Sequence, residues 1–143
     1  MTTVNIYLNF PGNCRQAFEF YRSIFGGDFP YVVTYGQMPV QEGMPPVAEN
    51  MIDKIMHMSL PISKETTLMG SDAGGGWEPE LVMGNNFSIC VNPDSKEEAD
   101  RIFGALAEVG KVMMPLSITF WGDYFGTLTD QFGINWMLLV SLS

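Results

Sequence analysis

The sequence predicts an α+β protein made of two βαβββ modules that repeat one another. An amphipathic helix is expected twice, at residues 13–27 and 95–109, each time after a strand-like run. The two expected capping residues, Asn13 and Ser95, lie 82 positions apart. The same offset aligns Pro11 with Pro93, Ala17 with Ala99, and Tyr21 with Phe103. An internal repeat of this kind indicates two equivalent supersecondary units.

The first module is expected over about residues 1–73 and begins with a strand and a helix. Residues 3–10 alternate between apolar and polar side chains, which predicts a strand with one apolar face. Asn13 is a suitable N-cap, and Gln16 is placed to complete a capping box. Gly26-Gly27 offers the left-handed conformation that commonly ends a helix. Between these ends the apolar residues share one helical stripe: Cys14, Ala17, Phe18, Tyr21, Ile24 and Phe25.

The rest of the first module is expected to contain three further strands and one long loop. Residues 28–35, 52–62 and 66–71 are rich in apolar and β-branched side chains and are predicted as strands. Residues 36–50 contain too many glycines and prolines for a regular element. Because long loops in compact domains often cover binding sites, this loop is a candidate lid. The glycine-rich residues 74–84 are predicted to link the two modules.

The second module is expected over about residues 85–143, within one domain that spans residues 1–143. Ser95 and Glu98 are predicted to form a capping box at the start of its helix, and Gly110 to end that helix. The other elements expected in this module are strands, at residues 86–92, 111–117, 118–126 and 134–141.

Composition excludes several classes of function. The formal net charge of −9 disfavours binding to nucleic acids and to anionic membranes, because both carry negative charge. No basic segment followed by an apolar block marks a signal peptide, and no apolar run is long enough to cross a bilayer. Cys14 and Cys90 are expected to be buried thiols of a protein in a reducing compartment. We therefore expect a cytoplasmic protein.

His57, the only histidine in the chain, is the first candidate for a functional residue. It lies in a predicted strand, where the pattern leaves open whether it is a structural residue, a general base or a ligand contact. Ser71-Asp72 is expected to form a turn in which Asp72 caps the backbone. The alternative is a polar contact to a ligand.

An aromatic cluster near the C-terminus is the second candidate. It comprises Phe120, Trp121, Tyr124 and Phe125, with Trp136 nearby in the sequence. Large aromatic residues usually belong to a core, but they also form walls for flat organic ligands. Gly122 and Gly126 favour the second interpretation, because glycine beside aromatic residues allows close approach. The eleven methionines include candidates for an adaptable lining.

Three segments of the sequence resemble a known family. The segments GNCRQAFEFYRSIFGGDF, TTLMGSD and PLSITFWGDYFGTLTDQFGINWML are similar to PhnB-like proteins of the vicinal oxygen chelate superfamily. This superfamily also contains glyoxalase I, bleomycin-resistance proteins and extradiol dioxygenases. The resemblance covers nearly the whole chain. It implies paired βαβββ modules that form an incomplete barrel, the glyoxalase/bleomycin resistance/dihydroxybiphenyl dioxygenase fold, commonly as a homodimer.

Some members of this family are named demethylubiquinone methyltransferases. The sequence has no glycine-rich strand-to-helix turn followed by an acidic residue that would suggest a methyl-donor site, so we give that name no weight.

The resemblance also implies where a metal would be held in related enzymes, on the first and last strands of each module. In this sequence the predicted strands 4–10, 66–71, 86–92 and 134–141 contain neither histidine nor carboxylate. Serine, methionine and tryptophan do not replace such ligands. We therefore expect no metal and no cofactor.

Together these observations predict a metal-free protein that binds a small, partly apolar organic ligand in a concave pocket. The expected polar contacts are His57 and Ser71, and the expected wall is Trp121, Tyr124 and Phe125. The alternative is a degenerate lyase, isomerase or other enzyme that uses His57 as a base or holds a metal at an unusual place. A purely structural dimer without a ligand is a third interpretation.

Overall fold

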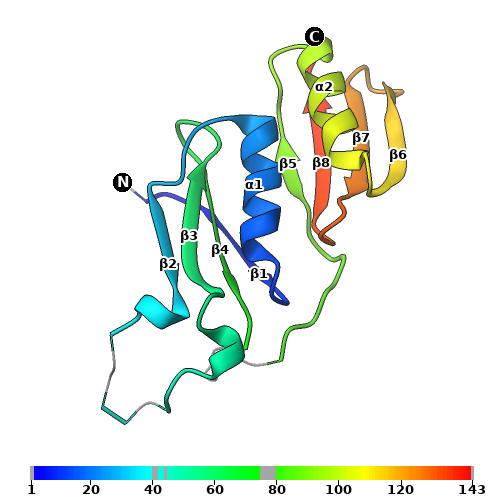
Figure 1. Ribbon diagram of the computed structural model, residues 1–143. Helices are drawn as coiled ribbons and strands as arrows, with labels where there is room; N and C mark the ends of the chain where they lie inside the picture. The colour runs from blue at the N-terminus through cyan, green and yellow to red at the C-terminus, as the bar shows by residue number, and fades with distance from the viewer. Residues whose placement is uncertain (1, 40–41, 44, 75–79, 143) are drawn as a thin grey trace. The chain divides into compact units, whose positions relative to one another are not determined.

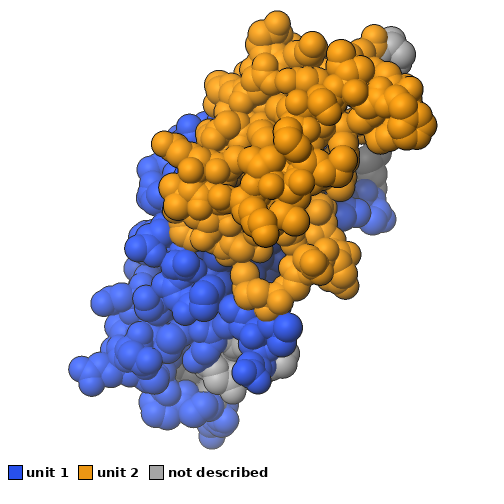
Figure 2. Space-filling model, turned by 90° about the vertical axis from the view of Figure 1, so that its right-hand side faces the viewer, with its two compact units in different colours: residues 1–82 blue, residues 83–143 orange. Residues whose placement is uncertain are grey.

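The computed structural model describes residues 2–39, 42–43, 45–74 and 80–142. The chain divides into two compact units, Met1–Val82 and Met83–Ser143 (Figure 2). The boundary falls inside the predicted linker 74–84, of which residues 75–79 lie outside the described part. That the two units make up one domain stays a prediction.

Within the described residues, each unit contains one α-helix and one four-stranded sheet (Figure 1). The first unit consists of β1 (Ile6–Phe10), α1 (Cys14–Phe25), β2 (Tyr31–Thr34), the 3₁₀ helices η1 (Tyr35–Gln37) and η2 (Glu49–Met51), β3 (Ile55–Pro61) and β4 (Thr67–Asp72). The second consists of β5 (Ile89–Val91), α2 (Lys96–Ala107), β6 (Lys111–Ile118), β7 (Tyr124–Thr129) and β8 (Asn135–Val140).

The two sheets have the same topology. Their strand orders are β1-β4-β3-β2 and β5-β8-β7-β6. In each sheet the first strand pairs in parallel with the last, and the other pairs are antiparallel. The predicted α+β class and the repeat of two βαβββ modules are therefore confirmed.

The core of the first unit lies between its sheet and α1. Alternate residues of β1, Leu8 and Phe10, are buried, as the period of a strand requires. Phe18 of α1 packs directly over Gly70 of β4, where an added Cβ would come within 2.7 Å of the Phe18 ring. The small residue in the strand thus allows close contact between helix and sheet.

The start of α1 differs from the prediction. The side chain of Asn13 makes no capping hydrogen bond to the helix. Instead, Asp72 at the end of β4 accepts a hydrogen bond from the backbone N–H of Cys14 through Oδ1, at 2.9 Å. The capping box of Asn13 and Gln16 was therefore wrong, because a buried carboxylate from a distant strand occupies the position of the capping group.

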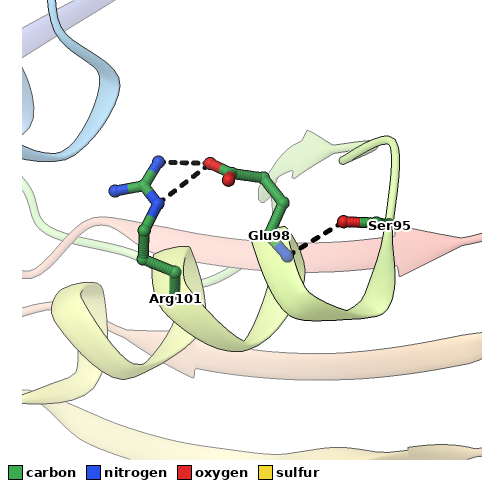
Figure 3. A network of polar contacts seen from close by, with 3 residues as sticks. All are labelled: Ser95, Glu98 and Arg101. Carbon is green, nitrogen blue, oxygen red and sulfur yellow. Dashed lines mark hydrogen bonds and ion pairs between the residues drawn. The ribbon is translucent and has the colours of Figure 1, made fainter.

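The start of α2 follows the prediction more closely (Figure 3). The Oγ atom of Ser95 accepts a hydrogen bond from the backbone N–H of Glu98, at 3.1 Å. The Glu98 carboxylate, expected to reach back toward Ser95, pairs instead with Arg101 one turn further along the helix. This hydrogen bond lowers the pKa of Glu98. The N-cap is confirmed, and the carboxylate follows the common i,i+3 pairing on a helix surface.

The glycines at the helix ends act in two different ways. Gly26 has φ of +80° and donates its N–H to the carbonyl of Arg22, but its ψ of −171° places it in an extended region open to glycine and not in the predicted left-handed helical conformation. Gly110 does not adopt a left-handed conformation, and α2 ends earlier, at Ala107. A Cβ at Gly110 would lie 2.3 Å from the carbonyl oxygen of Thr129. Gly110 is therefore needed for close backbone packing and does not terminate the helix.

Several predicted strand boundaries were too wide. Residues 28–35 contain only the short strand β2, and residues 86–92 only β5. The predicted strand 118–126 is interrupted by a turn, in which the N–H of Gly122 bonds the carbonyl of Thr119 and Gly122 has φ of +95°. Aromatic residues in this segment favoured a strand, but the glycine determines a turn. The predicted lid, 36–50, includes parts of both η1 and η2, while residues 40, 41 and 44 lie outside the described part.

The two cysteines differ in exposure, although both were expected to be buried. Cys14 is fully buried, whereas Cys90 is exposed. Burial, and secondarily the Asp72 carboxylate, strongly raise the pKa of the Cys14 thiol. Partial burial of the Cys90 thiol also raises its pKa, although the residue as a whole is exposed.

A disulfide reagent that releases a measurable thiol for each cysteine it modifies is expected to modify only Cys90 in the native protein. This reaction should be slower than that of free cysteine, because the thiolate is the reactive form and the raised pKa of Cys90 lowers its thiolate fraction. Cys14 is expected to react only at the rate of unfolding. Cys90→Ser should abolish the fast phase and leave the slow one. Fast modification of two thiols in the native protein would contradict this assignment.

Candidate functional site

The first sheet has one face covered by α1 and an opposite face, here called the helix-free face. Leu8 and Phe10 of β1 point to the helix, so Tyr7 and Asn9 lie on the helix-free face. The strand register places Met69 beside Tyr7 and Ser71 beside Asn9. The Ser71 hydroxyl donates to Oδ1 of Asn9 at 3.2 Å. This face therefore carries polar and aromatic side chains.

A β-bulge in β3 changes the direction of two side chains. Val33 pairs with His57, but the next residue of β2, Thr34, pairs with Ile55. Met56 is thus an extra residue in β3 that has no pairing partner in β2. Ile55 and Met58, on either side, are both buried, while Met56 and His57 are half-buried. Bulges of this kind commonly redirect side chains near binding sites.

Tyr7, Tyr31, Met56 and His57 line an open hollow of about 370 Å³ on this face. The hydroxyl of Tyr7 lies 3.2 Å from Nδ1 of His57. The Tyr7 and His57 ring centroids are 5.5 Å apart, with an angle of 39° between the ring planes. Tyr31 stands edge-on to His57, at 5.3 Å and 68°. Three rings and a thioether thus surround the hollow.

The strands that carry the hollow contain almost no formal charge. Among the described strand residues of the first unit, only Asp72 carries a charged side chain. Its carboxylate is 1% exposed and accepts N–H groups of Cys14 and Ile55, so it belongs to the helix-covered side. Within the described residues, no three His, Cys, Asp or Glu side chains are grouped so that they could hold a metal ion.

Ser71 and Asp72 belong to β4 and do not form the predicted turn. Ser71 lies on the helix-free face, where the register places it on the strand next to His57. Asp72 accepts hydrogen bonds from backbone N–H groups, as expected, but it does so from the last position of strand β4 and not from a turn. The expectation that the last strand of the first module has no carboxylate was wrong by one residue, because β4 extends to Asp72.

The aromatic cluster of the second unit is divided between different places. The Trp121 side chain is 55% exposed in the β6–β7 turn, and its Nε1 donates to Oδ2 of Asp123 at 2.9 Å. Its ring contacts Phe120 and Phe125, with centroid distances of 4.9 and 6.1 Å. Phe120 is 97% exposed. Trp121 and Phe125 therefore share one surface, as the predicted wall requires.

Tyr124 does not join this surface. Gly126, two residues further along β7, lies under Phe103 of α2, so alternation places Tyr124 on the side of the helix. Its hydroxyl donates to the Asp100 carboxylate at 2.5 Å, and the Lys96 ammonium lies 4.9 Å from its ring centroid. The hydrogen bond to Asp100 raises the pKa of Tyr124.

Trp136 is a core residue. It is fully buried, and its Nε1 donates to Oδ2 of the buried Asp130 at 2.9 Å. The other carboxylate oxygen of Asp130 accepts the N–H groups of Phe132 and Ile134. This network fixes the turn between β7 and β8.

Sequence reasoning did not single out Tyr7, Tyr31 or Met56. The alternation of residues 3–10 does place Tyr7 on the polar side of its strand, and a large aromatic residue there was the available signal. The position of Met56 beside the hollow depends on the β-bulge, and no residue type in the sequence of β3 indicates that bulge.

The sequence model of the family described as 3-demethylubiquinone-9 3-methyltransferase matches residues 2–139. The chain belongs to this family. The chain is similar in fold to a solved structure, the putative 3-demethylubiquinone-9 3-methyltransferase, PhnB protein, from Bacillus cereus. That protein is 23% identical, with a TM-score of 0.76, and the match covers 98% of this chain and all of the other.

Two other proteins are more similar to the chain in sequence. Protein YjdN of Escherichia coli (strain K12) is 32% identical over 139 residues, which cover 94% of this chain and 92% of YjdN. Protein PA1353 from Pseudomonas aeruginosa is 40% identical, with a TM-score of 0.83, and the match covers 99% and 98% of the two chains.

The fold of this PhnB-like protein is that of the glyoxalase/bleomycin resistance proteins. A glyoxalase/bleomycin resistance protein from Albidiferax ferrireducens T118 has a TM-score of 0.61 at 17% identity, and the match covers 95% of each chain. This likeness confirms the predicted fold class. No helix within the described residues has the length and apolarity needed to span a bilayer.

Proposed function

We propose that this PhnB-like protein binds a small, partly apolar organic molecule on the helix-free face of the first sheet, against Tyr7, Tyr31, Met56 and His57. The hollow that these residues line, of about 370 Å³, is the observation that carries the proposal. Its walls are aromatic or thioether groups, which suit flat or branched apolar parts of a ligand. Tyr7 and His57 provide polar atoms that would orient it.

The exposure of the lining supports a binding role over a purely structural one. Tyr7 and Tyr31 are 45% and 49% exposed, although both are large aromatic residues on a sheet. A ligand that covered them would remove apolar surface from water, at a gain of about 25 cal/mol per Å². Ser71, on the same face, is a further proposed polar contact.

The second unit supplies another proposed contact surface. Trp121 and Phe125 present adjacent aromatic rings and remain candidates for an apolar wall, whereas Tyr124 is engaged by Asp100 and Lys96. The homodimer and the cytoplasmic location that the family resemblance and the composition suggest are likewise proposals.

Catalysis with His57 as a general base is the second candidate function. The observation that favours it is the contact between the Tyr7 hydroxyl and Nδ1 of His57, because a hydrogen bond at one ring nitrogen orients the other. If Tyr7 donates this bond, Nε2 of the neutral ring carries the proton, and this nitrogen is then a donor to the ligand and not a base. If Nδ1–H donates to Tyr7, Nε2 is free to accept a proton. Metal analysis of the purified protein would test the expected absence of a metal in either case.

A fragment screen by ligand-observed NMR tests the binding proposal. We expect aromatic fragments to bind the wild-type protein and to lose at least about five-fold in affinity in Tyr31→Leu, because the ring that forms one wall of the hollow is removed. The matched control is Phe20→Leu, which removes a ring from α1, on the opposite face of the same sheet. Trp121→Leu tests the second aromatic surface. Fragments that bind all three variants as tightly as wild type would contradict the proposed site.

A further inference from the structure

The chemistry of the hollow on the first sheet restricts the charge of its ligand. The described strand residues around it include no lysine or arginine, and the one carboxylate of these strands, on Asp72, is turned toward α1 and Ile55. An anionic ligand would therefore lose hydration without gaining a partner of fixed positive charge, which is costly. The net charge of −9 on the chain adds a long-range repulsion of anions and an attraction of cations.

The three rings around the hollow are suited to a cation. Tyr7 and Tyr31 stand on either side of the His57 ring, with centroids 5.5 and 5.3 Å from it and planes inclined by 39° and 68°. Tilted and edge-to-face contacts of this kind are ordinary between aromatic rings, and they leave Tyr7 and Tyr31 45% and 49% exposed where they line the hollow. The electron-rich faces of aromatic rings attract ammonium groups within about 6 Å, and most strongly those whose alkyl groups reduce their hydration.

We propose that the hollow lined by Tyr7, Tyr31, Met56 and His57 recognises the alkylated ammonium group of a small organic cation. This inference rests on the proposed function and adds the chemical class of the ligand. The ammonium head lies among the rings, and its alkyl groups contact the Met56 thioether. Tyr7 and His57 hold one another through the bond at Nδ1, so the rest of the ligand meets the outer edge of the imidazole.

Three probe molecules of nearly equal shape separate the effect of ligand charge on affinity from the effect of ligand shape. Choline, 3,3-dimethyl-1-butanol and 3,3-dimethylbutanoate share a branched head and are cationic, neutral and anionic, respectively. Their binding to the full-length protein is followed by two-dimensional NMR titration at one fixed pH. We expect choline to bind at least about five-fold more tightly than the alcohol, and the butanoate to bind most weakly.

Variants at the rings identify the source of this preference. Tyr31→Leu keeps an apolar group of similar bulk but removes a ring, so it should reduce choline binding by about five-fold and change alcohol binding by less than about two-fold. Tyr7→Phe keeps the ring and should retain the preference for choline. Phe20→Leu on α1 should behave as the wild-type protein. Tyr31 is half-exposed, so its replacement is not expected to prevent folding.

Results that would overturn the ammonium proposal can be distinguished from results that would overturn the proposed binding site. Equal or tighter binding of the alcohol or the butanoate would overturn the assignment of an ammonium ligand. Failure of all three probes to bind would overturn it as well. In either case, fragments that still depend on Tyr31 would leave the proposed binding site standing. If such fragments were also lacking, both proposals would be wrong.

Discussion

Replacing Asp72 with alanine is expected to lower the free energy of unfolding by about 2–6 kcal/mol, because each of two buried N–H groups that lose their acceptor costs about 1–3 kcal/mol. Asp72 is 1% exposed, and its carboxylate oxygens lie 2.9 Å from the Cys14 nitrogen and 2.8 Å from the Ile55 nitrogen. It joins the first turn of α1 to the start of β3. Its negative charge also suits the N-terminus of a helix.

Urea unfolding followed by circular dichroism measures this loss, and two further variants define its cause. Asp72→Asn retains one acceptor oxygen and places an amide donor against the other N–H group, so it should also be clearly destabilising. Asp28→Ala removes an exposed carboxylate from the same unit and should change stability by less than about 0.5 kcal/mol. A loss below about 1 kcal/mol in Asp72→Ala would show that water or a rearranged backbone satisfies the two N–H groups.

Replacing Gly110 with alanine is expected to lower the free energy of unfolding by about 1–3 kcal/mol, the usual range for atoms forced into filled space. The added Cβ would lie 2.3 Å from the carbonyl oxygen of Thr129 and 2.9 Å from the Cα atom of Asp130. Both contacts are to backbone, so no side chain can turn away to relieve them. Residue 110 would have to move away from the β7–β8 corner.

Gly104 provides the matched control for this prediction. It lies within α2, and a Cβ added there meets nothing within 4 Å. Gly104→Ala should therefore raise stability by about 0.5–1 kcal/mol, through its higher helix propensity. Thermal unfolding of the two variants should shift in opposite directions. A shift in the same direction would mean that the close packing at Gly110 relaxes without cost.

The repeated architecture was predictable because it depends on local patterns. The apolar spacing of α1 and α2, the serine cap at Ser95 and the glycine after α1 act within a few residues of one another. Those patterns recur at a constant offset, so they also predicted that both sheets would have the same topology. The boundaries were less accurate at residues 118–126, where aromatic residues indicated a strand and Gly122 formed a turn.

The candidate site was only partly predictable. His57 and Ser71 were identified from residue type, and both lie on the helix-free face of the first sheet. Tyr7 and Tyr31 come from strands that pair with different neighbours, so their approach to His57 depends on strand order. The direction of Met56 depends on a register shift between β2 and β3. Pairing of this kind involves residues about twenty or more positions apart, which a local pattern does not specify.

The amino-acid sequence determined two βαβββ modules, their helices and the lack of basic surface, because periodicity and charge are properties of the chain. Only the tertiary structure decided what holds those elements and what surrounds His57. Asp72 caps a helix that begins 58 residues earlier, and Tyr7 contacts a histidine 50 residues later. Such contacts arise when strands pair and a helix packs on them, so their partners cannot be recognised until the sheet has formed.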